Sequence, residues 1–215
     1  MCIVIHIFFK FRIIMRLILI RHGQTDYNVA RLIQGSGVDA HLNDVGHAQA
    51  RKVGQRFISA SIDHIYSSDQ KRAEQTMQYI AQHHQNIKPI LHPSLRERSA
   101  GVFEGKHYRY YDFFRKIARS AWHNFRPWGA ESMEQLQKRV VLWYEEIKRK
   151  HAGETIVVVT HGAVINALSL HIMKKELTSE NAKSVAAKNT AVFEFNHTDT
   201  GIDIIRINCV QHLSD

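Results

Sequence analysis

The chain has 215 residues, of which 44% are hydrophobic and 23% charged, and its formal net charge is +9. These values are typical of a soluble protein with one well-cored domain, and they argue against a disordered or two-domain chain. The excess of Lys and Arg favours anionic partners, whether nucleic acid, acidic lipid or phosphorylated small molecules. Because Cys2 and Cys209 form no CxxC pair, we expect no disulfide and a cytoplasmic location.

The N-terminal segment, MCIVIHIFFKFRIIMRLILI, looks like a leader peptide but is interrupted by Lys10, Arg12 and Arg16. It therefore falls short of the roughly 20 apolar residues that span a bilayer. A secretory signal would carry its positive charges before the apolar run, and here the order is reversed. We expect residues 1–14 to be an extension upstream of a natural start at Met15, with a membrane-surface anchor as the alternative.

From residue 16 onward the apolar pattern alternates between strands and helices. The expected elements are, in chain order, a strand at 17–20, a helix at 43–58, a strand at 61–68, a helix at 70–83, a strand at 87–92, helices at 107–126 and 133–147, a strand at 154–162, a helix at 163–173, and strands at 190–195 and 201–207. The continuous apolar run at 17–20 is typical of a strand covered on both faces. Asn43 or Asp44 caps the first helix, and Pro89 favours a sheet edge for the third strand. This alternation predicts a three-layer α/β/α sandwich with a mostly parallel sheet.

Two of the expected strands end in a His-Gly pair, His22 with Gly23 and His161 with Gly162. In open α/β sheets the ligand crevice lies beyond the carboxyl ends of the strands, so both histidines are expected at one edge. The glycines allow a sharp turn and a close approach of the backbone to a ligand. A single histidine in this position is more often structural; two in matched contexts indicate a site.

Arginines accompany these histidines. Arg21 directly precedes His22, and Arg72 lies in the first turn of the expected helix at 70–83, where the helix dipole favours an anion. Their guanidinium groups are suited to the oxygens of one phosphoryl group. The structural alternative is a solvated Arg72 that pairs with Glu74 or Asp69.

The segment SLRERSAGVFEGK, after the third strand, offers two carboxylates. Glu97 lies between Arg96 and Arg98, and Glu104 follows a short apolar stretch. Flanking arginines lower the pKa of a carboxylate, whereas burial beside a phosphate raises it. The residue pattern leaves Glu97 and Glu104 equally eligible as a general acid.

Four segments together resemble the signature of a known family. RHGQTDYN, SSDQKRAEQT, LRERSAGVFEG and VVVTHGAVI are similar, in this order, to the motifs of the histidine phosphatase superfamily, branch 1, which has the phosphoglycerate mutase-like fold. The similarity runs from Met15 to about residue 208. It implies an enzyme without metal or cofactor, because arginines and histidines supply the positive charge that the chemistry needs.

The resemblance also implies roles for the charged residues. His22 is the nucleophile that forms a transient phosphohistidine. Arg21, Arg72 and His161 neutralise the equatorial oxygens of the transferred phosphoryl group. His161 is expected to be cationic there, whereas His22 must attack as the neutral imidazole.

The resemblance distinguishes the two carboxylates as well. Glu97 matches the proton donor to the leaving group, and Glu104 matches a glutamate that looks structural. The implied substrate contacts are Gly23, Thr25, Asn28, Gln34 and Gly162. Two residues depart from the family pattern: His41 stands where proline is usual, and Phe103 where tryptophan is common.

We expect a small helical lid over about residues 106–130. Residues 106–126 hold six Lys or Arg, one acid and seven aromatics. This composition fits a cap that selects a second phosphate or a phosphoprotein, and also nucleic-acid binding. Helical spacing instead favours buried side chains at Phe114, Ala118, Trp122 and Phe125. The exposed face then consists of Arg115, Lys116 and Arg119.

Hydrolysis of a small phosphorylated metabolite is the preferred function. The sequence after Glu97 resembles phosphatases of the fructose-bisphosphatase type more than mutases, although broad-specificity and α-ribazole phosphatases share much of it. Mutase activity and phosphoprotein hydrolysis are the enzymatic alternatives. A basic RNA- or membrane-binding module and a non-catalytic phosphoprotein-binding relative are the non-enzymatic ones. We expect a phosphorylated small molecule as the partner, no nucleic acid, no stable membrane insertion, and a homodimer as one option.

Overall fold

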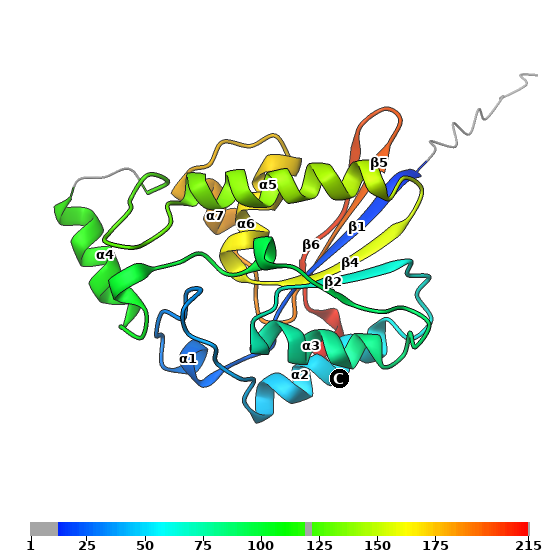
Figure 1. Cartoon of the computed structure of the whole chain (residues 1–215), viewed down its shortest axis with the longest axis horizontal. Coiled ribbons are helices and arrows are strands. Elements are labelled where there is room, and N and C mark those ends of the chain that lie inside the picture. Colours follow the sequence, from blue (N-terminus) through cyan, green and yellow to red (C-terminus); the bar gives the residue numbers. More distant parts are fainter. Residues whose placement is uncertain (1–12, 119–121, 215) are drawn as a thin grey trace, which may run out of the picture.

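A computed structural model of the chain describes residues 13–118 and 122–214, which form a central sheet between two layers of helices (Figure 1). The expected N-terminal extension lies almost entirely outside these residues. Met15 is fully buried within the first strand, which begins two residues before it. A natural start at Met15 therefore stays a prediction.

Six strands form one mixed sheet. They are β1 (Ile13–Arg21), β2 (His64–Ser67), β3 (Ile90–Leu91), β4 (Thr155–Thr160), β5 (Val192–Thr198) and β6 (Ile202–Cys209). Their order is β3-β2-β4-β1-β5-β6. The pairs among β1, β2, β3 and β4 are parallel, and those of β5 with β1 and β6 are antiparallel. The mostly parallel sheet is thus confirmed, with short β3 at an edge as Pro89 predicted.

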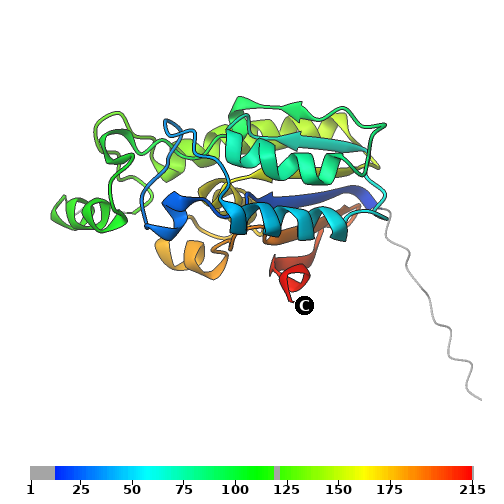
Figure 2. The same cartoon turned by 90° about the horizontal axis from the view of Figure 1, so that it is seen from below.

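The strand β1 is apolar on both faces because helices cover both faces. Leu17 and Leu19 belong to a core cluster with residues of α5 (Met133–Lys150) and α6 (Gly162–Ile172). Ile18 and Ile20 point the other way, into a cluster with α2 (Asp44–Arg56) and α3 (Lys71–Ala81). Figure 2 shows the same layers from below. This arrangement fixes β1 firmly, and β1 carries Arg21 and delivers His22 at its end.

The remaining helices are short. They are α1 (Asp26–Val29), α4 (Tyr108–Ile117), α7 (Ser179–Ser184) and the 3₁₀ turns η1 (Pro93–Leu95), η2 (Gly101–Phe103) and η3 (Gln211–Leu213). The sequence pattern did not predict α1, which is only one turn long. Asn43 caps α2 as expected, since its Oδ1 accepts a hydrogen bond from the Gly46 N–H at 2.9 Å. None of the helices in the described parts of the chain is long and apolar enough to cross a membrane.

The helix expected at 107–126 is present but shorter than predicted, and the role of residues 106–130 as a lid stays a prediction. The helix α4 projects at one end of the molecule (Figure 1) and stops at Ile117, well before residue 126. Phe114 is 43% exposed, because Tyr111 is the α4 residue that packs with Phe103 and Phe125 in a small separate core. Phe125 is buried as expected, but it reaches this core from an irregular segment. Helical spacing therefore did not predict how Phe114 and Phe125 pack.

The other residues of the expected lid differ in their exposure to solvent. Ala118 is exposed, contrary to the prediction, and Trp122 is partly buried. Lys116 is exposed and Arg115 partly so, as the sequence suggested, whereas Arg119 lies outside the described residues.

Candidate active site

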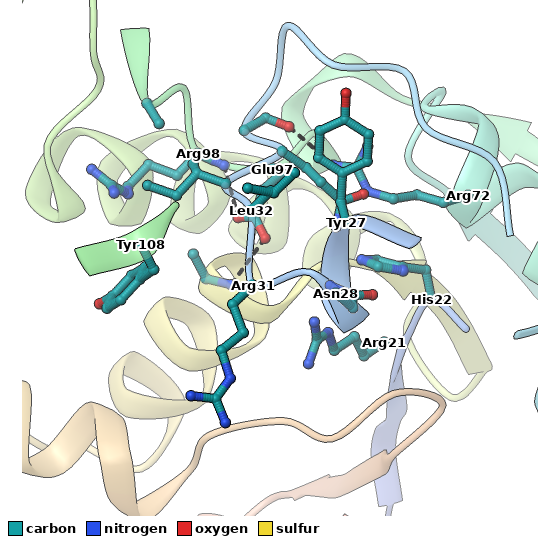
Figure 3. Close-up of a pocket in the computed structure, with 15 residues that line it drawn as sticks. Arg21, His22, Tyr27, Asn28, Arg31, Leu32, Arg72, Glu97, Arg98 and Tyr108 are labelled. Atoms are coloured by element: carbon teal, nitrogen blue, oxygen red, sulfur yellow. Dashed lines mark hydrogen bonds between the residues drawn. The ribbon is translucent and has the colours of Figure 1, made fainter. Parts of the chain in front are cut away.

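A cavity of about 430 Å³ opens beyond the carboxyl ends of the central strands, with Tyr108 at the start of α4 in its lining (Figure 3). Its walls come from the ends of β1, α3 and α6, from α1 and the residues after it, and from the segment after η1. The lining residues are Arg21, His22, Tyr27, Asn28, Arg31, Leu32, Ile33, Gln34, Gly35, Arg72, Glu97, Arg98, Ala100, Tyr108 and Ala163. The carboxyl edge of the sheet thus gathers charged side chains from distant parts of the sequence, as the strand pattern predicted.

His22 is held in one tautomer. Its Nδ1 lies 2.7 Å from the Gly23 carbonyl oxygen, which can only accept, so Nδ1 carries the proton and Nε2 keeps its lone pair. Burial lowers the pKa of His22 well below 6.5, and the cations Arg72 and Arg21 act in the same direction. At neutral pH the ring is therefore an uncharged imidazole with a free nitrogen, which is the form a nucleophile requires.

His161 lies beside His22, with ring centroids 5.2 Å apart and the planes inclined by 57°. It is fully buried and does not line the cavity; its Nε2 lies 2.8 Å from the Ser68 hydroxyl, and its Nδ1 has no hydrogen-bond partner. Burial, Arg72 and His22 lower the pKa of His161 well below 6.5. The ring is thus neutral beside the protein's own groups, and a cationic His161 next to a bound phosphoryl group stays a prediction. A phosphate dianion beside the ring would act in the opposite sense.

The two arginines keep hydrogen-bond donors without a partner; Arg72 is buried and Arg21 is partly buried. Arg72 is 1% exposed and donates to the carbonyl oxygens of Val38 at 2.9 Å and Gly35 at 3.0 Å. Arg21 donates from Nη1 to the Ala187 carbonyl at 2.7 Å. In both side chains the Nε–H is buried without a partner. Burial lowers the pKa of Arg72 to about 10 and also that of Arg21, so both stay charged at neutral pH. Cations with free donors favour an anion.

Only one of the two candidate carboxylates reaches the cavity. Glu97 lines it and accepts hydrogen bonds from the N–H groups of Arg98 at 2.8 Å and Ala163 at 3.4 Å. Figure 3 shows Glu97 held between these contacts. Glu104 instead accepts from the Ser36 N–H at 3.1 Å and the Ala100 N–H at 3.0 Å, outside the cavity lining. The geometry therefore favours Glu97 for proton transfer and Glu104 for loop support.

Glu104 also explains two glycines. A Cβ added to Gly35 or Gly37 would lie 2.2 Å or 2.1 Å from an oxygen of its carboxylate. The loop that carries Gln34 therefore packs directly against Glu104. A side chain at Gly35 or Gly37 would displace the Glu104 carboxylate.

The expected substrate contacts divide into two groups. Asn28 and Gln34 line the cavity, and Gln34 is 8% exposed with its Oε1 unpartnered. Gly23, Thr25 and Gly162 do not line it. Thr25 caps α1, accepting from the Asn28 N–H at 3.2 Å, and a Cβ on Gly23 would lie 2.5 Å from the Gly46 carbonyl oxygen. The described structure thus assigns these three positions to the frame of the site rather than to its lining.

Several residues that support the site were not predicted from the sequence pattern. Asn189 donates from Nδ2 to the His22 carbonyl at 3.1 Å and to Asn28 Oδ1 at 3.2 Å. Gln70 accepts from the Glu97 N–H at 2.8 Å and donates to the Gly35 carbonyl at 3.2 Å. The signal for Asn189 was its place just before β5, because an antiparallel strand begins at the edge where β1 ends. His41, the departure from the family pattern, is exposed and outside the lining.

Comparisons with known proteins agree with this geometry. The profile of the histidine phosphatase superfamily (branch 1) matches residues 17–210. Phosphoglycerate mutase-like protein 4 of Arabidopsis thaliana is 40% identical over 158 residues, 71% of this chain and 68% of that protein. Putative phosphoserine phosphatase 2 of Hydrogenobacter thermophilus is 30% identical over 92% of this chain and 97% of its own length.

Solved structures extend the comparison to the fold. Phosphoserine phosphatase from Entamoeba histolytica, solved in complex with 3-phosphoglyceric acid, is 29% identical, covers 93% of this chain with 99% of its own, and gives a TM-score of 0.79. The structure described as Bacillus stearothermophilus YhfR gives 0.84 at 27% identity over 93% of this chain and 100% of its own. The four motifs, the sheet order, the cavity and these relatives lead to one conclusion: the chain belongs to branch 1 of the histidine phosphatase superfamily.

Proposed function

We propose that the protein is a metal-independent phosphomonoesterase that works through a phosphohistidine on His22. The observation that carries this proposal is that a neutral His22, fixed in one tautomer, meets two cations at one cavity, the buried Arg72 and the partly buried Arg21. A neutral imidazole can attack phosphorus without first losing a proton. The two guanidinium groups compensate the charge of the transferred phosphoryl group, which is otherwise the role of a metal ion.

The reaction proceeds in two displacements. The Nε2 lone pair of His22 attacks phosphorus, the P–O bond of the ester breaks, and Glu97 donates a proton to the leaving alkoxide. Water then attacks phosphorus, Glu97 accepts its proton, and the P–N bond breaks to release inorganic phosphate and free His22. Arg21, Arg72 and His161 stabilise the negative oxygens in both steps.

Small phosphorylated metabolites are the proposed substrates. A cavity of about 430 Å³ accommodates a metabolite, and the relatives include a protein named metal-independent phosphoserine phosphatase and one named fructose-2,6-bisphosphatase. Arg31 and Arg98 line the same cavity in addition to Arg21 and Arg72. These outer cations favour substrates that carry a second anionic group, such as a carboxylate or a second phosphate.

We infer a cytoplasmic location from the cysteine content, and we keep a homodimer as an option for solution measurement. Mutase and phosphoprotein phosphatase activities are the enzymatic alternatives. Non-enzymatic binding of RNA or membranes, suggested by the net charge of +9, is the alternative outside catalysis.

The test is a phosphatase panel with EDTA present. The panel contains an aryl phosphate, phosphoserine, phosphoglycerates, fructose bisphosphates and phosphopeptides. We expect phosphate release that EDTA does not affect, loss of turnover in His22→Ala, and retention in the matched control His41→Ala. Turnover that needs a divalent metal, or that persists in His22→Ala, would contradict the mechanism. Polyanion binding that is the same in His22→Ala as in the unaltered chain, together with no phosphate release, would favour the non-enzymatic alternative.

A further inference from the structure

A second cluster of ionisable side chains lies at the amino ends of the strands, opposite the candidate active site. His64 is the first residue of β2, and Glu154 directly precedes β4, its parallel neighbour. His151 ends α5 as its C-cap. The start of two adjacent parallel strands and the end of a helix thus converge here, and neither the fold nor the proposed reaction needs an imidazole pair at this place.

The three side chains are close enough to share one ion. Their potential ligand atoms all lie within 4.8 Å of one another. Glu154 Oε2 is 3.1 Å from His64 Nε2 and 2.6 Å from His151 Nδ1, and the two imidazole rings lie with centroids 4.1 Å apart. Zinc in tetrahedral coordination, with bonds of 2.0–2.1 Å, holds its ligand atoms roughly 3.3 Å apart. The carboxylate oxygen already meets this spacing with His64, and His151 needs only a small outward shift.

The buried histidine also has an outer partner. The Nε2 of His151 lies 2.9 Å from the hydroxyl of Tyr66, which is 2% exposed. Histidines that bind metal usually donate their second ring N–H to such a partner, which fixes the ring and its tautomer. His151 is itself buried, whereas the side chains of His64 and Glu154 are 33% and 39% exposed. One ligand is therefore held rigidly, and the other two face an open position.

We propose that His64, His151 and Glu154 form a binding site for a divalent transition metal of the zinc type. Two imidazole nitrogens and one carboxylate oxygen suit Zn²⁺ and its neighbours, whereas Mg²⁺ and Ca²⁺ prefer oxygen ligands alone. Water completes the coordination on the exposed side. The bound ion links the end of α5 to the starts of β2 and β4, so its effect is on stability, and it takes no part in the phosphatase reaction.

The protons balance without a change in the charge of His151. In the hydrogen-bonded cluster the His151 Nδ1–H donates to Glu154. Metal binding at Nδ1 requires the proton on Nε2, where it is donated to the Tyr66 hydroxyl oxygen. This shift of tautomer replaces one hydrogen bond by a metal bond and keeps the other.

The experiment uses the full, untagged chain after metal removal. Thermal unfolding and isothermal titration are followed at pH 7.5 with ZnCl₂, and with MgCl₂ as the comparison ion. We expect Zn²⁺ to bind one site and raise the melting temperature, and Mg²⁺ to have no such effect. His64→Gln and Glu154→Gln, both at partly exposed positions, are expected to weaken Zn²⁺ binding at least tenfold. Tyr66→Phe should weaken it about 10–100-fold, since it removes only the outer partner of His151.

The control is His171→Gln. His171 lies 4.0 Å from Glu145, which makes a two-residue pair of the same chemistry on the surface, and its loss should leave Zn²⁺ binding unchanged. Basal phosphatase activity should be the same in His64→Gln as in the unaltered chain. If Zn²⁺ produces no shift, or an equal one in His64→Gln, the cluster is a hydrogen-bonded network without a metal and the proposal is wrong.

Discussion

The rings of His22 and His161 lie side by side with centroids 5.2 Å apart, and the charge of one opposes protonation of the other. Burial and the nearby Arg72 and Arg21 act in the same direction on both rings. The pair is therefore neutral in the protein alone, next to two fixed cations. An incoming phosphate dianion is the group that makes a proton on His161 favourable.

This pair predicts how stability depends on pH. A histidine whose pKa is lowered on folding binds fewer protons in the native state, so the unfolded chain gains protons first as the pH falls below about 6.5. The free energy of unfolding should accordingly decrease on acidification, by up to about 1.4 kcal/mol per pH unit for each such histidine. Chemical denaturation between pH 7.5 and 5 measures this slope. His161→Gln should flatten it, and an unchanged slope in that variant would show that other groups dominate.

Substitution of Arg72 should lower catalytic activity more than it lowers the free energy of unfolding. Arg72→Lys keeps one charge but loses the planar set of donors that the site directs at an anion. We expect kcat/KM to fall about 10²–10³-fold, the usual loss when a donor to the transferred group is removed. Steady-state kinetics with an aryl phosphate measures the change. Arg56→Lys, at a surface position on α2, is the control, and it should leave kcat/KM within twofold.

Substitution of Glu97 should change the kinetics, whereas substitution of Glu104 should change the stability of the fold. Glu97→Gln is expected to lower kcat about 10²–10⁴-fold, because the leaving alkoxide loses its proton donor. The loss should shrink for substrates with good leaving groups such as aryl phosphates.

Glu104→Gln should instead act on the fold. Its carboxylate accepts hydrogen bonds from two backbone N–H groups, and weakening them should reduce the free energy of unfolding by about 1–3 kcal/mol. Urea denaturation gives this value. A loss of turnover in Glu104→Gln without destabilisation, and unchanged turnover in Glu97→Gln, would reverse the assignment.

Arg31 tests the substrate class. It has a left-handed backbone with φ of 54°. Lys174, which follows α6 and does not line the cavity, has the same conformation with φ of 55°. In Arg31→Gly and Lys174→Gly, relief of backbone strain and the greater freedom of glycine in the unfolded chain nearly offset each other. Both variants should change the free energy of unfolding by less than about 1 kcal/mol. Only Arg31→Gly should lower kcat/KM, by about tenfold or more, for phosphoserine and phosphoglycerate. Equal kinetics in the two variants would exclude a substrate role for Arg31.

Sequence reasoning predicted best where periodicity and strand position determine the structure. The strand ends at His22 and His161, the helix start at Arg72 and the apolar run of β1 follow from such local patterns. It failed in the lid, where Phe114 and Phe125 have helical spacing but occupy different segments. It also missed Asn189, since a side chain that holds the His22 carbonyl from 167 positions away leaves no local pattern.

The position of β1 between β4 and β5 has a consequence for synthesis of the chain. Leu17 pairs with Ile156 on one side and Phe195 on the other, and the Arg21 guanidinium donates a hydrogen bond to the Ala187 carbonyl oxygen. A nascent chain on the ribosome therefore holds its nucleophile strand without β4 until residue 160 has been made, and without β5 until residue 198 of 215. Catalytic competence should arise late and abruptly during translation, and until then the exposed apolar strand is a target for chaperones.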